Sequence, residues 1–220
     1  SGLAAVLDTA RAVSCGEGGL YVAGGVESMT RAPFVVAKSE SAFGRDFKVF
    51  DTTIGARFPN PRLVEQYGND TMPETADNVA AQFGLGREDS DRFAARSQAK
   101  YAAARAAGFY EGEILPIAVP TGRKTPPAMV LDDEHPRPES DFDSLSRLKP
   151  LAAGGVVTAG NASGINDGAA AVLIGSAAAG EKAGQKPIAR ILAGAVAGVE
   201  PRIMGVGPAP ATRKVLALAG

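Results

Sequence analysis

The stretch Val156–Gly168 (VVTAGNASGINDG) sets small polar side chains among glycines and runs directly into the apolar segment Ala169–Ile174. An apolar run of this length after a turn-rich segment predicts a buried β-strand. Asn161, Ser163 and Asn166 are compact hydrogen-bonding residues, which suits a loop that lies close against a ligand or another stretch of backbone. The same residues would equally satisfy their own backbone through Asx-type hydrogen bonds. Both interpretations of this loop stay open here.

Outward from this loop, strands and helices are expected to alternate at both ends of the chain. A helix with the apolar face Leu3, Val6, Leu7 and Ala10 is predicted to end at Gly16 in the left-handed conformation. Leu20–Ala23 then predicts a buried strand, followed by a tight turn at Gly24 and Gly25. Towards the other end, the pattern predicts a helix at 177–183, a strand at 188–196 and a last helix after it.

The middle of the chain has a different character. Residues 31–61 show no periodicity and predict a long loop, whereas Pro73–Phe83 and residues 88–107 predict helices that end at glycines. A strand is expected at 113–119, followed by a basic, proline-rich loop at 121–138. The whole pattern predicts an α/β core interrupted by a helical insertion.

Composition excludes several classes of protein. The 220 residues carry a formal charge of −1, from 23 basic and 24 acidic side chains, so no long-range field attracts nucleic acid or an anionic membrane. The apolar runs are too short to cross a bilayer. A single cysteine and the lack of a signal peptide at the start favour the reducing cytoplasm.

Cys15 and His135 are the only cysteine and the only histidine, and they do not resemble a catalytic pair. A nucleophilic thiolate is usually stabilised at a helix N-terminus, whereas Cys15 follows the predicted C-terminal end of its helix. His135 lies in a proline-rich segment among carboxylates, which favours a solvated surface role. A cysteine hydrolase that uses these two residues is the weakest hypothesis, and one Cys with one His predicts no zinc site.

Several segments together, in order along essentially the whole chain, resemble the thiolase family. They are SGLAAV at 1–6, AGGVESM at 23–29, MPETADNVA at 72–80, RLKP at 147–150, TAGNASGINDGAAA at 158–171 and GVGPAPA at 205–211. DTTIG at 51–55, YG at 67–68 and DEHPRPE at 133–139 look most like the degradative 3-oxoadipyl-CoA thiolases of aromatic catabolism. The related 3-ketoacyl-CoA thiolases of β-oxidation share much of this pattern. Thr71, where biosynthetic members carry His, also favours a degradative enzyme.

The resemblance implies a five-layered α/β/α/β/α fold of two similar halves, with a helical loop domain inserted in the first. Residues 1–33 and 160–183 would then belong to the N-terminal half, residues 34–159 to the coenzyme A (CoA)-binding loop domain, and residues 184–220 to the start of the C-terminal half. It also implies a cytoplasmic homo-oligomer, a dimer or tetramer in the full-length protein, which takes CoA and acyl-CoA as substrates and needs no further cofactor or metal.

In thiolases the acyl group passes to a cysteine, while a second cysteine and a histidine manage the proton on the acetyl-CoA carbon. Ser1-Gly2 matches only the end of the family's Cys-(Gly or Ala)-Ser-Gly segment, and the other catalytic motifs have no counterpart here. The resemblance therefore implies no catalytic residue, and the chain is expected to be an internal fragment that is inactive alone. The alternative is a non-catalytic CoA-binding or oligomerisation module.

What the resemblance does imply is ligand binding. Ser163 and the backbone of Ala159 and Ala162 match positions along the pantetheine path, Arg137 and Ser144 match positions near the adenine and ribose, and Met72 matches a position at the acyl pocket.

Overall fold

The computed structural model describes residues 2–220, so that Ser1, with which the first family motif begins, lies outside the described residues. The chain divides into two compact units. The first contains the chain as far as Thr75 together with Ile165–Gly220, and the second is Ala76–Gly164. The two units are defined by how the chain packs and not by what it binds. The CoA-binding domain expected at 34–159 therefore stays a prediction.

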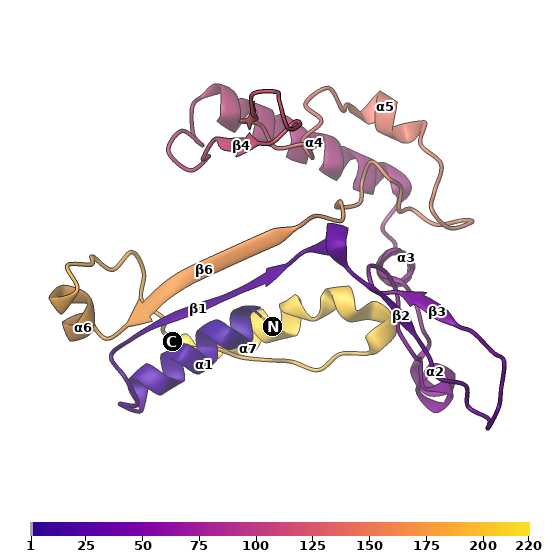
Figure 1. Cartoon of the computed structure of the whole chain (residues 1–220), viewed down its shortest axis with the longest axis horizontal. Coiled ribbons are helices and arrows are strands. Elements are labelled where there is room, and N and C mark those ends of the chain that lie inside the picture. Colours follow the sequence, from indigo (N-terminus) through magenta and orange to yellow (C-terminus); the bar gives the residue numbers. More distant parts are fainter. Residues whose placement is uncertain (1) are drawn as a thin grey trace. The chain divides into compact units, whose positions relative to one another are not determined.

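The first unit is built on a long antiparallel ribbon and the helix beside it (Figure 1). Helix α1 (Gly2–Ser14) ends as predicted, with Gly16 in the left-handed region at φ +76°. Strand β1 (Leu20–Glu27) pairs with β6 (Gly168–Gly175) along the full length of both strands, and α1 contacts both. An amphipathic helix thus covers one face of the ribbon.

Gly24 and Gly25 lie inside β1, so the predicted tight turn is wrong. Gly24 pairs with Ala171, and a Cβ atom on Gly24 would lie 2.5 Å from the carbonyl oxygen of Ala170. Glycine therefore serves close approach of two backbones here. Pairing with a distant strand keeps β1 extended through a pair of residues that would permit a turn.

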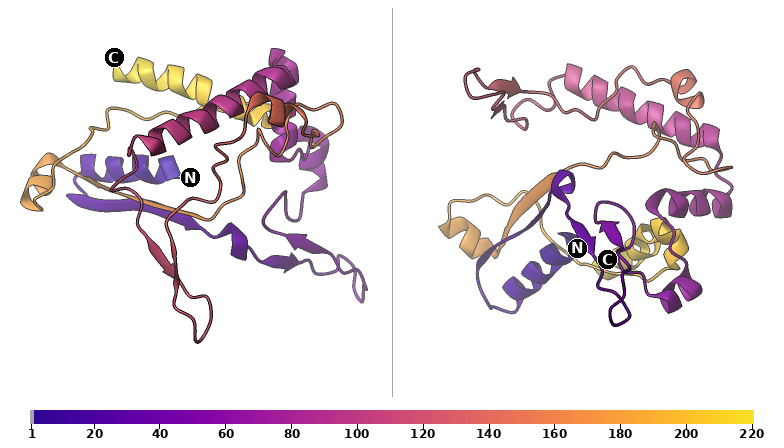
Figure 2. Two further views of the ribbon diagram at one scale, coloured as in Figure 1. Left: turned by 90° about the horizontal axis from the view of Figure 1, so that it is seen from above. Right: turned by 45° about the vertical axis from the view of Figure 1, so that its right-hand side comes forward.

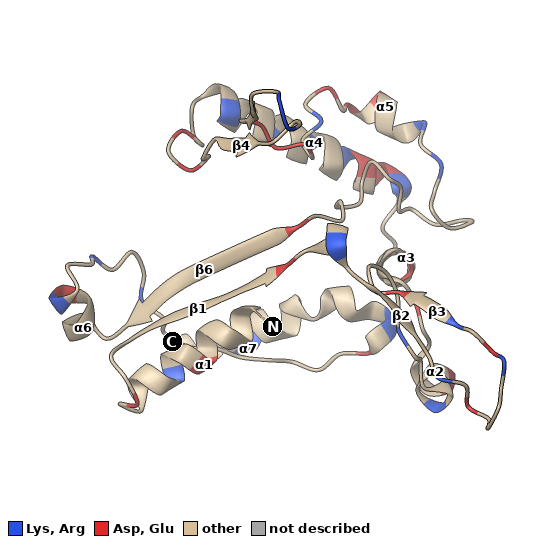
Figure 3. Ribbon diagram, viewed as in Figure 1, with Lys and Arg blue, Asp and Glu red and all other residues tan. Residues whose placement is uncertain are grey.

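The prediction that β6 is buried is also wrong, since none of its residues is buried. Val172 and Leu173 are about half exposed, at 49% and 51%. Residues of β6 alternate between two faces, and α1 lies against only one of them. Figure 3 shows the ribbon almost free of charge, with Glu27 the only charged residue of either strand.

Residues 31–61 contain more structure than the predicted loop. A 3-10 turn at Met29–Arg31 leads into a hairpin of β2 (Phe34–Val36) and β3 (Val49–Asp51), and α2 (Pro61–Tyr67) follows. The Asn60 side chain caps α2 by accepting from the N–H of Arg62 at 3.0 Å. Strands of three residues are too short for periodicity to reveal.

The predicted strand at 188–196 is absent among the described residues, because that segment has no strand beside it to pair with. The helix predicted before it is confirmed as α6 (Ala177–Lys182), and the last helix as α7 (Pro208–Ala219), which follows a 3-10 segment at Pro201–Val206.

Two predicted helices of the middle region are confirmed. Helix α3 (Met72–Phe83) crosses from the first unit into the second, and α4 (Arg87–Ala106) is the longest helix of the second unit. Gly84 and Gly108 end them with φ of +64° and +71°. The short helix α5 (Phe142–Ser146) was not predicted.

The strand expected at 113–119 is shorter than predicted. It forms only as β4 (Ile117–Val119), which pairs with β5 (Ala128–Val130) inside the predicted basic loop. Figure 2 shows this hairpin extending away from α4.

The mixed α/β class is confirmed, although the sheets are three separate antiparallel pairs of strands among the described residues. Within that part of the chain, no helix is both long and apolar enough to cross a membrane.

Candidate functional site

The glycine-rich loop is tied at its start to α3. The carboxylate oxygen Oδ1 of Asp77 accepts hydrogen bonds from the N–H groups of Val156, at 2.7 Å, and Val157, at 3.1 Å. The other oxygen, Oδ2, is buried and has no hydrogen-bond partner among the described residues. A Cβ atom on Gly155 would lie 2.3 Å from that oxygen, so only glycine fits there. Asp77 therefore fixes where the loop begins.

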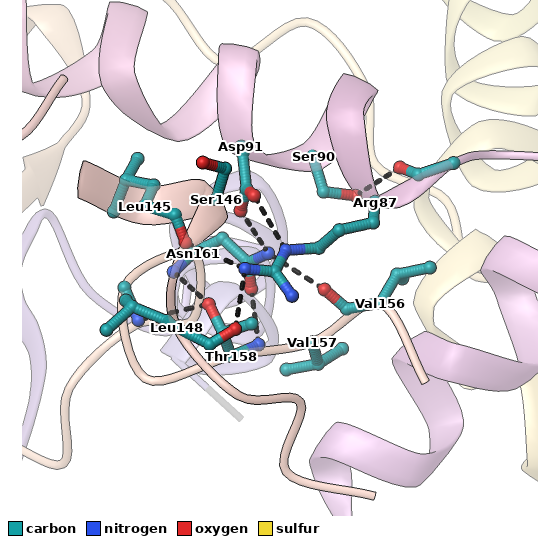
Figure 4. A network of polar contacts seen from close by, with 12 residues as sticks. Arg87, Ser90, Asp91, Leu145, Ser146, Leu148, Val156, Val157, Thr158 and Asn161 are labelled. Atoms are coloured by element: carbon teal, nitrogen blue, oxygen red, sulfur yellow. Dashed lines mark hydrogen bonds and ion pairs between the residues drawn. The ribbon is translucent and has the colours of Figure 1, made fainter. Parts of the chain in front are cut away.

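Asn161 holds the turn that follows (Figure 4). Its Oδ1 accepts from the N–H of Thr158 at 2.7 Å, and its Nδ2 donates to the carbonyl oxygen of Val156 at 2.9 Å. The hydroxyl of Thr158, a fully buried residue, accepts from the N–H groups of Gly160 and Asn161. For Asn161 the structure confirms the Asx-type alternative: its side chain satisfies local backbone.

An ion pair on α4 supports the same turn, and the sequence analysis missed it. Asp91 is fully buried, and its Oδ2 accepts from Nε of Arg87 at 2.6 Å. Its Oδ1 accepts from Nδ2 of Asn161 at 3.0 Å. Both carboxylate oxygens thus have a donor, which compensates the cost of burying the charge.

Arg87 extends this network to the segment around α5. Its guanidinium donates to the carbonyl oxygens of Leu145, at 2.7 Å, and Leu148, at 2.9 Å. The only sequence signal for any part of this network is the spacing of four residues between Arg87 and Asp91, which form the ion pair. That spacing is common on exposed helix faces, so it does not reveal a buried network.

The three predicted pantetheine residues flank the anchored positions. Ala159 and Ser163 are exposed, and Ala162 is half-buried with its N–H donating to the carbonyl of Thr158 at 3.1 Å. Their side chains are small, so none of the three places a bulky group at the accessible surface of the turn.

Ser144 and Arg137, predicted to lie near the nucleotide, belong to two further segments of the second unit. Ser144 caps α5 together with Asp141. Hydrogen bonding by the N–H of Ser144, and to a smaller extent by its hydroxyl, lowers the pKa of the Asp141 carboxyl. Arg137 is exposed, its NH1 donates to the carbonyl oxygen of Glu134 at 2.7 Å, and its N–H donates to the Gln98 side chain on α4 at 2.9 Å.

Helix α4 thus carries all three segments of the second unit that hold predicted site residues. Gln98 holds the Arg137 segment, Arg87 holds the residues after Ser144, and Asp91 holds the turn around Asn161. Met72 belongs to the first unit, where it is exposed and begins α3.

Cys15 and His135 belong to different units of the chain. Cys15 is exposed and follows the C-terminal end of α1, as predicted, with its N–H donating to the carbonyl of Arg11 at 2.8 Å. His135 is exposed in the second unit. In the part of the chain that the structure describes, no group of His, Cys, Asp and Glu side chains is suited to a metal ion.

Comparison with known proteins supplies the family. The description "Thiolase, N-terminal domain" matches residues 1–178. The beta-ketoadipyl-CoA thiolase of Pseudomonas aeruginosa is 55% identical over 98% of this chain and 54% of its own length. The 3-oxoadipyl-CoA/3-oxo-5,6-dehydrosuberyl-CoA thiolase of Escherichia coli is 53% identical over 100% of this chain and 55% of its own length.

A solved structure agrees. Human mitochondrial 3-ketoacyl-CoA thiolase in complex with CoA superposes with a TM-score of 0.84 at 35% identity, over 100% of this chain and 53% of the human chain. The present chain therefore spans about half the length of the relatives it matches.

Proposed function

The chain belongs to the thiolase family, and on that premise we propose that it forms the CoA-binding part of an acyl-CoA C-acyltransferase. Such an enzyme converts a 3-oxoacyl-CoA and CoA into acetyl-CoA and a shortened acyl-CoA. The bond between C2 and C3 breaks, the acyl group passes through a cysteine to the sulfur of CoA, and C2 takes up a proton.

One observation carries the binding role: the turn at Thr158–Ser163 is held on α4 by a buried network, with small side chains at its accessible positions. A narrow thiol arm such as pantetheine needs a surface of this kind, pre-formed and without bulky groups. Arg137 supplies a cation for a nucleotide phosphate. The acyl pocket would include Met72.

For the substrate we propose 3-oxoadipyl-CoA. Identity is 53–55% with thiolases whose names specify β-ketoadipyl-CoA or 3-oxoadipyl-CoA, against 35% with the human 3-ketoacyl-CoA enzyme. The five-layered fold, the domain boundaries at residues 33, 159 and 183, the homo-oligomeric state and the cytoplasmic location belong to the same proposal.

The 220 residues are proposed to bind CoA without transferring acyl groups by themselves. Cys15 follows the end of a helix whose dipole disfavours a thiolate, and the resemblance connects neither Cys15 nor His135 with bond making. The alternative is a module that only binds CoA or only associates with itself. The exposed apolar ribbon β1–β6 is the observation that favours association.

Calorimetric titration of the chain with CoA tests the binding role, and a thiolysis assay with 3-oxoadipyl-CoA tests catalysis. We expect saturable binding and no thiolysis. The absence of heat at millimolar CoA would contradict the binding role and leave the association module. Hydrolysis of the thioester without added CoA that is lost in Cys15→Ala would instead support the cysteine hydrolase.

A further inference from the structure

Both amide hydrogens of Asn161 are already bonded within the chain, although the residue lies in the middle of the proposed binding turn. Its two amide hydrogens go to Asp91 Oδ1 and to the carbonyl of Val156, and its Oδ1 accepts from the N–H of Thr158. The partners also determine the orientation of the amide, because a carboxylate and a carbonyl both require donors.

The conformation of the turn depends on these bonds. Asn161 lies between Ala159 and Ala162 in the chain, and it fixes the backbone at Val156 and Thr158 before them. Gly160 packs so closely on the α5 segment that a Cβ atom there would lie 2.4 Å from a methyl carbon of Leu148 and 2.5 Å from one of Leu145. The turn therefore has little freedom to adopt another shape while this network is intact.

Asp91 makes it costly for the side chain of Asn161 to move. It is fully buried, so an Asn161 side chain that moved away would leave a buried carboxylate oxygen without its donor. Arg87 would remain on the other oxygen. The network thus transmits the position of α4, a helix of 20 residues, to a turn of six residues.

We propose that Asn161, held by Asp91, is a positioning residue that shapes the turn for the pantetheine arm of CoA without touching the ligand. This inference rests on the proposed function and adds residues that the family resemblance did not supply. It requires that the pantetheine-dependent part of CoA affinity depends on Asn161, while binding of the nucleotide part does not.

The test compares two ligands on the 220-residue chain, by calorimetry. CoA contains the arm, whereas adenosine 3′,5′-bisphosphate has the nucleotide without it. Asn161→Ala is expected to weaken CoA binding on the order of tenfold, because the turn that holds the pantetheine arm loses the hydrogen bonds that fix its shape. The Kd of the bisphosphate is expected to stay within about twofold, because this ligand lacks the arm. Gln82→Ala, which removes an exposed amide from α3 within the same unit, is the control and is expected to change neither Kd.

A second variant tests the proposal independently, in case Asn161→Ala does not fold. Asp91→Asn keeps the shape of the side chain, but its amide group faces a donor on one side, so one contact is lost. It is expected to weaken CoA binding several-fold with the bisphosphate again unaffected. Circular dichroism reports whether each variant is folded.

The outcomes separate the two levels of the proposal. If the unaltered chain binds neither ligand, the proposed function is wrong and the inference with it. Two other results would contradict positioning by Asn161 and leave the binding function intact. Either the folded variants bind CoA as tightly as the unaltered chain does, or their affinities for CoA and for the bisphosphate fall by the same factor.

Discussion

Asp77, Asn161 and Asp167 each hold a loop by accepting hydrogen bonds from main-chain N–H groups. In the first unit, Asp167 accepts from the N–H of Thr30 at 2.8 Å, from its hydroxyl at 2.7 Å and from the hydroxyl of Ser28 at 3.3 Å. These bonds join the segment after β1 to the residue before β6. Individual polar side chains therefore define the loops of a chain that has few buried apolar residues.

Asp167 makes the stability of the first unit dependent on pH. The N–H of Thr30, followed by its hydroxyl, lowers the pKa of Asp167 below the ordinary value of 3.8. A carboxyl whose folded pKa is depressed contributes stability above its unfolded pKa and loses that contribution as the pH falls through the folded pKa. We expect Asp167→Asn to lower the melting temperature at pH 7, with the difference shrinking as the pH falls below 3.8 and through the lowered folded pKa.

Asp46→Asn is the control for that prediction, since Asp46 is exposed and has no hydrogen bond among the described residues. Equal melting temperatures for Asp167→Asn and the unaltered chain at pH 7 would show that the three bonds to Asp167 do not stabilise the fold. Differential scanning calorimetry from pH 8 down to about pH 2, below the ordinary carboxyl pKa, gives both comparisons.

Arg137 is the residue on which nucleotide binding is expected to depend most. Arg137→Ala should weaken CoA binding on the order of tenfold, because a hydrogen bond to a charged phosphate contributes about 1.5–3 kcal/mol. Arg123→Ala removes the same charge from the β4–β5 hairpin of the same unit and should have less than a twofold effect. Calorimetry with CoA measures both affinities. An equal loss of affinity in the two variants would mean that Arg137 contributes only its charge and makes no specific contact with the nucleotide.

Helix α4 is the element on which the second unit depends. Its side chains Arg87, Asp91 and Gln98 reach three segments that are separated from it by 39 to 70 positions in the chain. A helix provides this because its backbone is rigid and its side chains project at regular intervals. The three segments of the second unit that hold predicted site residues are thus all bonded to this one helix.

At the ribbon β1–β6, two adjacent glycines differ in what they tolerate. Gly24→Ala places a Cβ atom 2.5 Å from the carbonyl oxygen of Ala170, whereas a Cβ atom on Gly25 meets nothing within 4 Å. We expect Gly24→Ala to destabilise the first unit by about 1–3 kcal/mol through overpacking, and Gly25→Ala to be neutral or slightly stabilising.

Hydrogen exchange of the β1 amides, measured by mass spectrometry, tests this pair of variants. Gly24→Ala should exchange faster than the unaltered chain, and Gly25→Ala should not. The same exchange rate in both variants would mean that the two strands separate easily to admit the extra methyl group.

At the scale of the whole molecule, the chain buries little apolar surface. Ala23, Ala80, Leu145 and Val157 are the buried apolar residues among those described. On the ribbon face away from Ala23, Val22 and Val26 are 71% and 79% exposed. Exposed apolar surface on this scale, with unpaired strand edges beside it, favours association.

We therefore expect the 220-residue chain to self-associate. Sedimentation velocity should show species heavier than the 22.4 kDa monomer at micromolar concentrations. Val22→Lys should shift the distribution towards the monomer, because burying an ammonium group is costly. Leu115→Lys, the same change of charge at an exposed site of the second unit, is the control. A monomer at all concentrations would contradict the prediction.

Helices α1, α3 and α4 and the glycines that end them were determined by the sequence itself, because periodicity and capping act within a few residues. The ordered motifs likewise sufficed for the thiolase family.

Only the tertiary structure decided which strands pair and which faces are covered, and so it corrected the turn at Gly24, the burial of β6 and the strand at 188–196. It also revealed the network of Arg87, Asp91 and Asn161. The two hydrogen-bonded residues Asp91 and Asn161 are 70 positions apart, and no local pattern specifies contact at that separation. Such contacts arise only when the chain has folded, because they depend on where whole helices and loops lie in space.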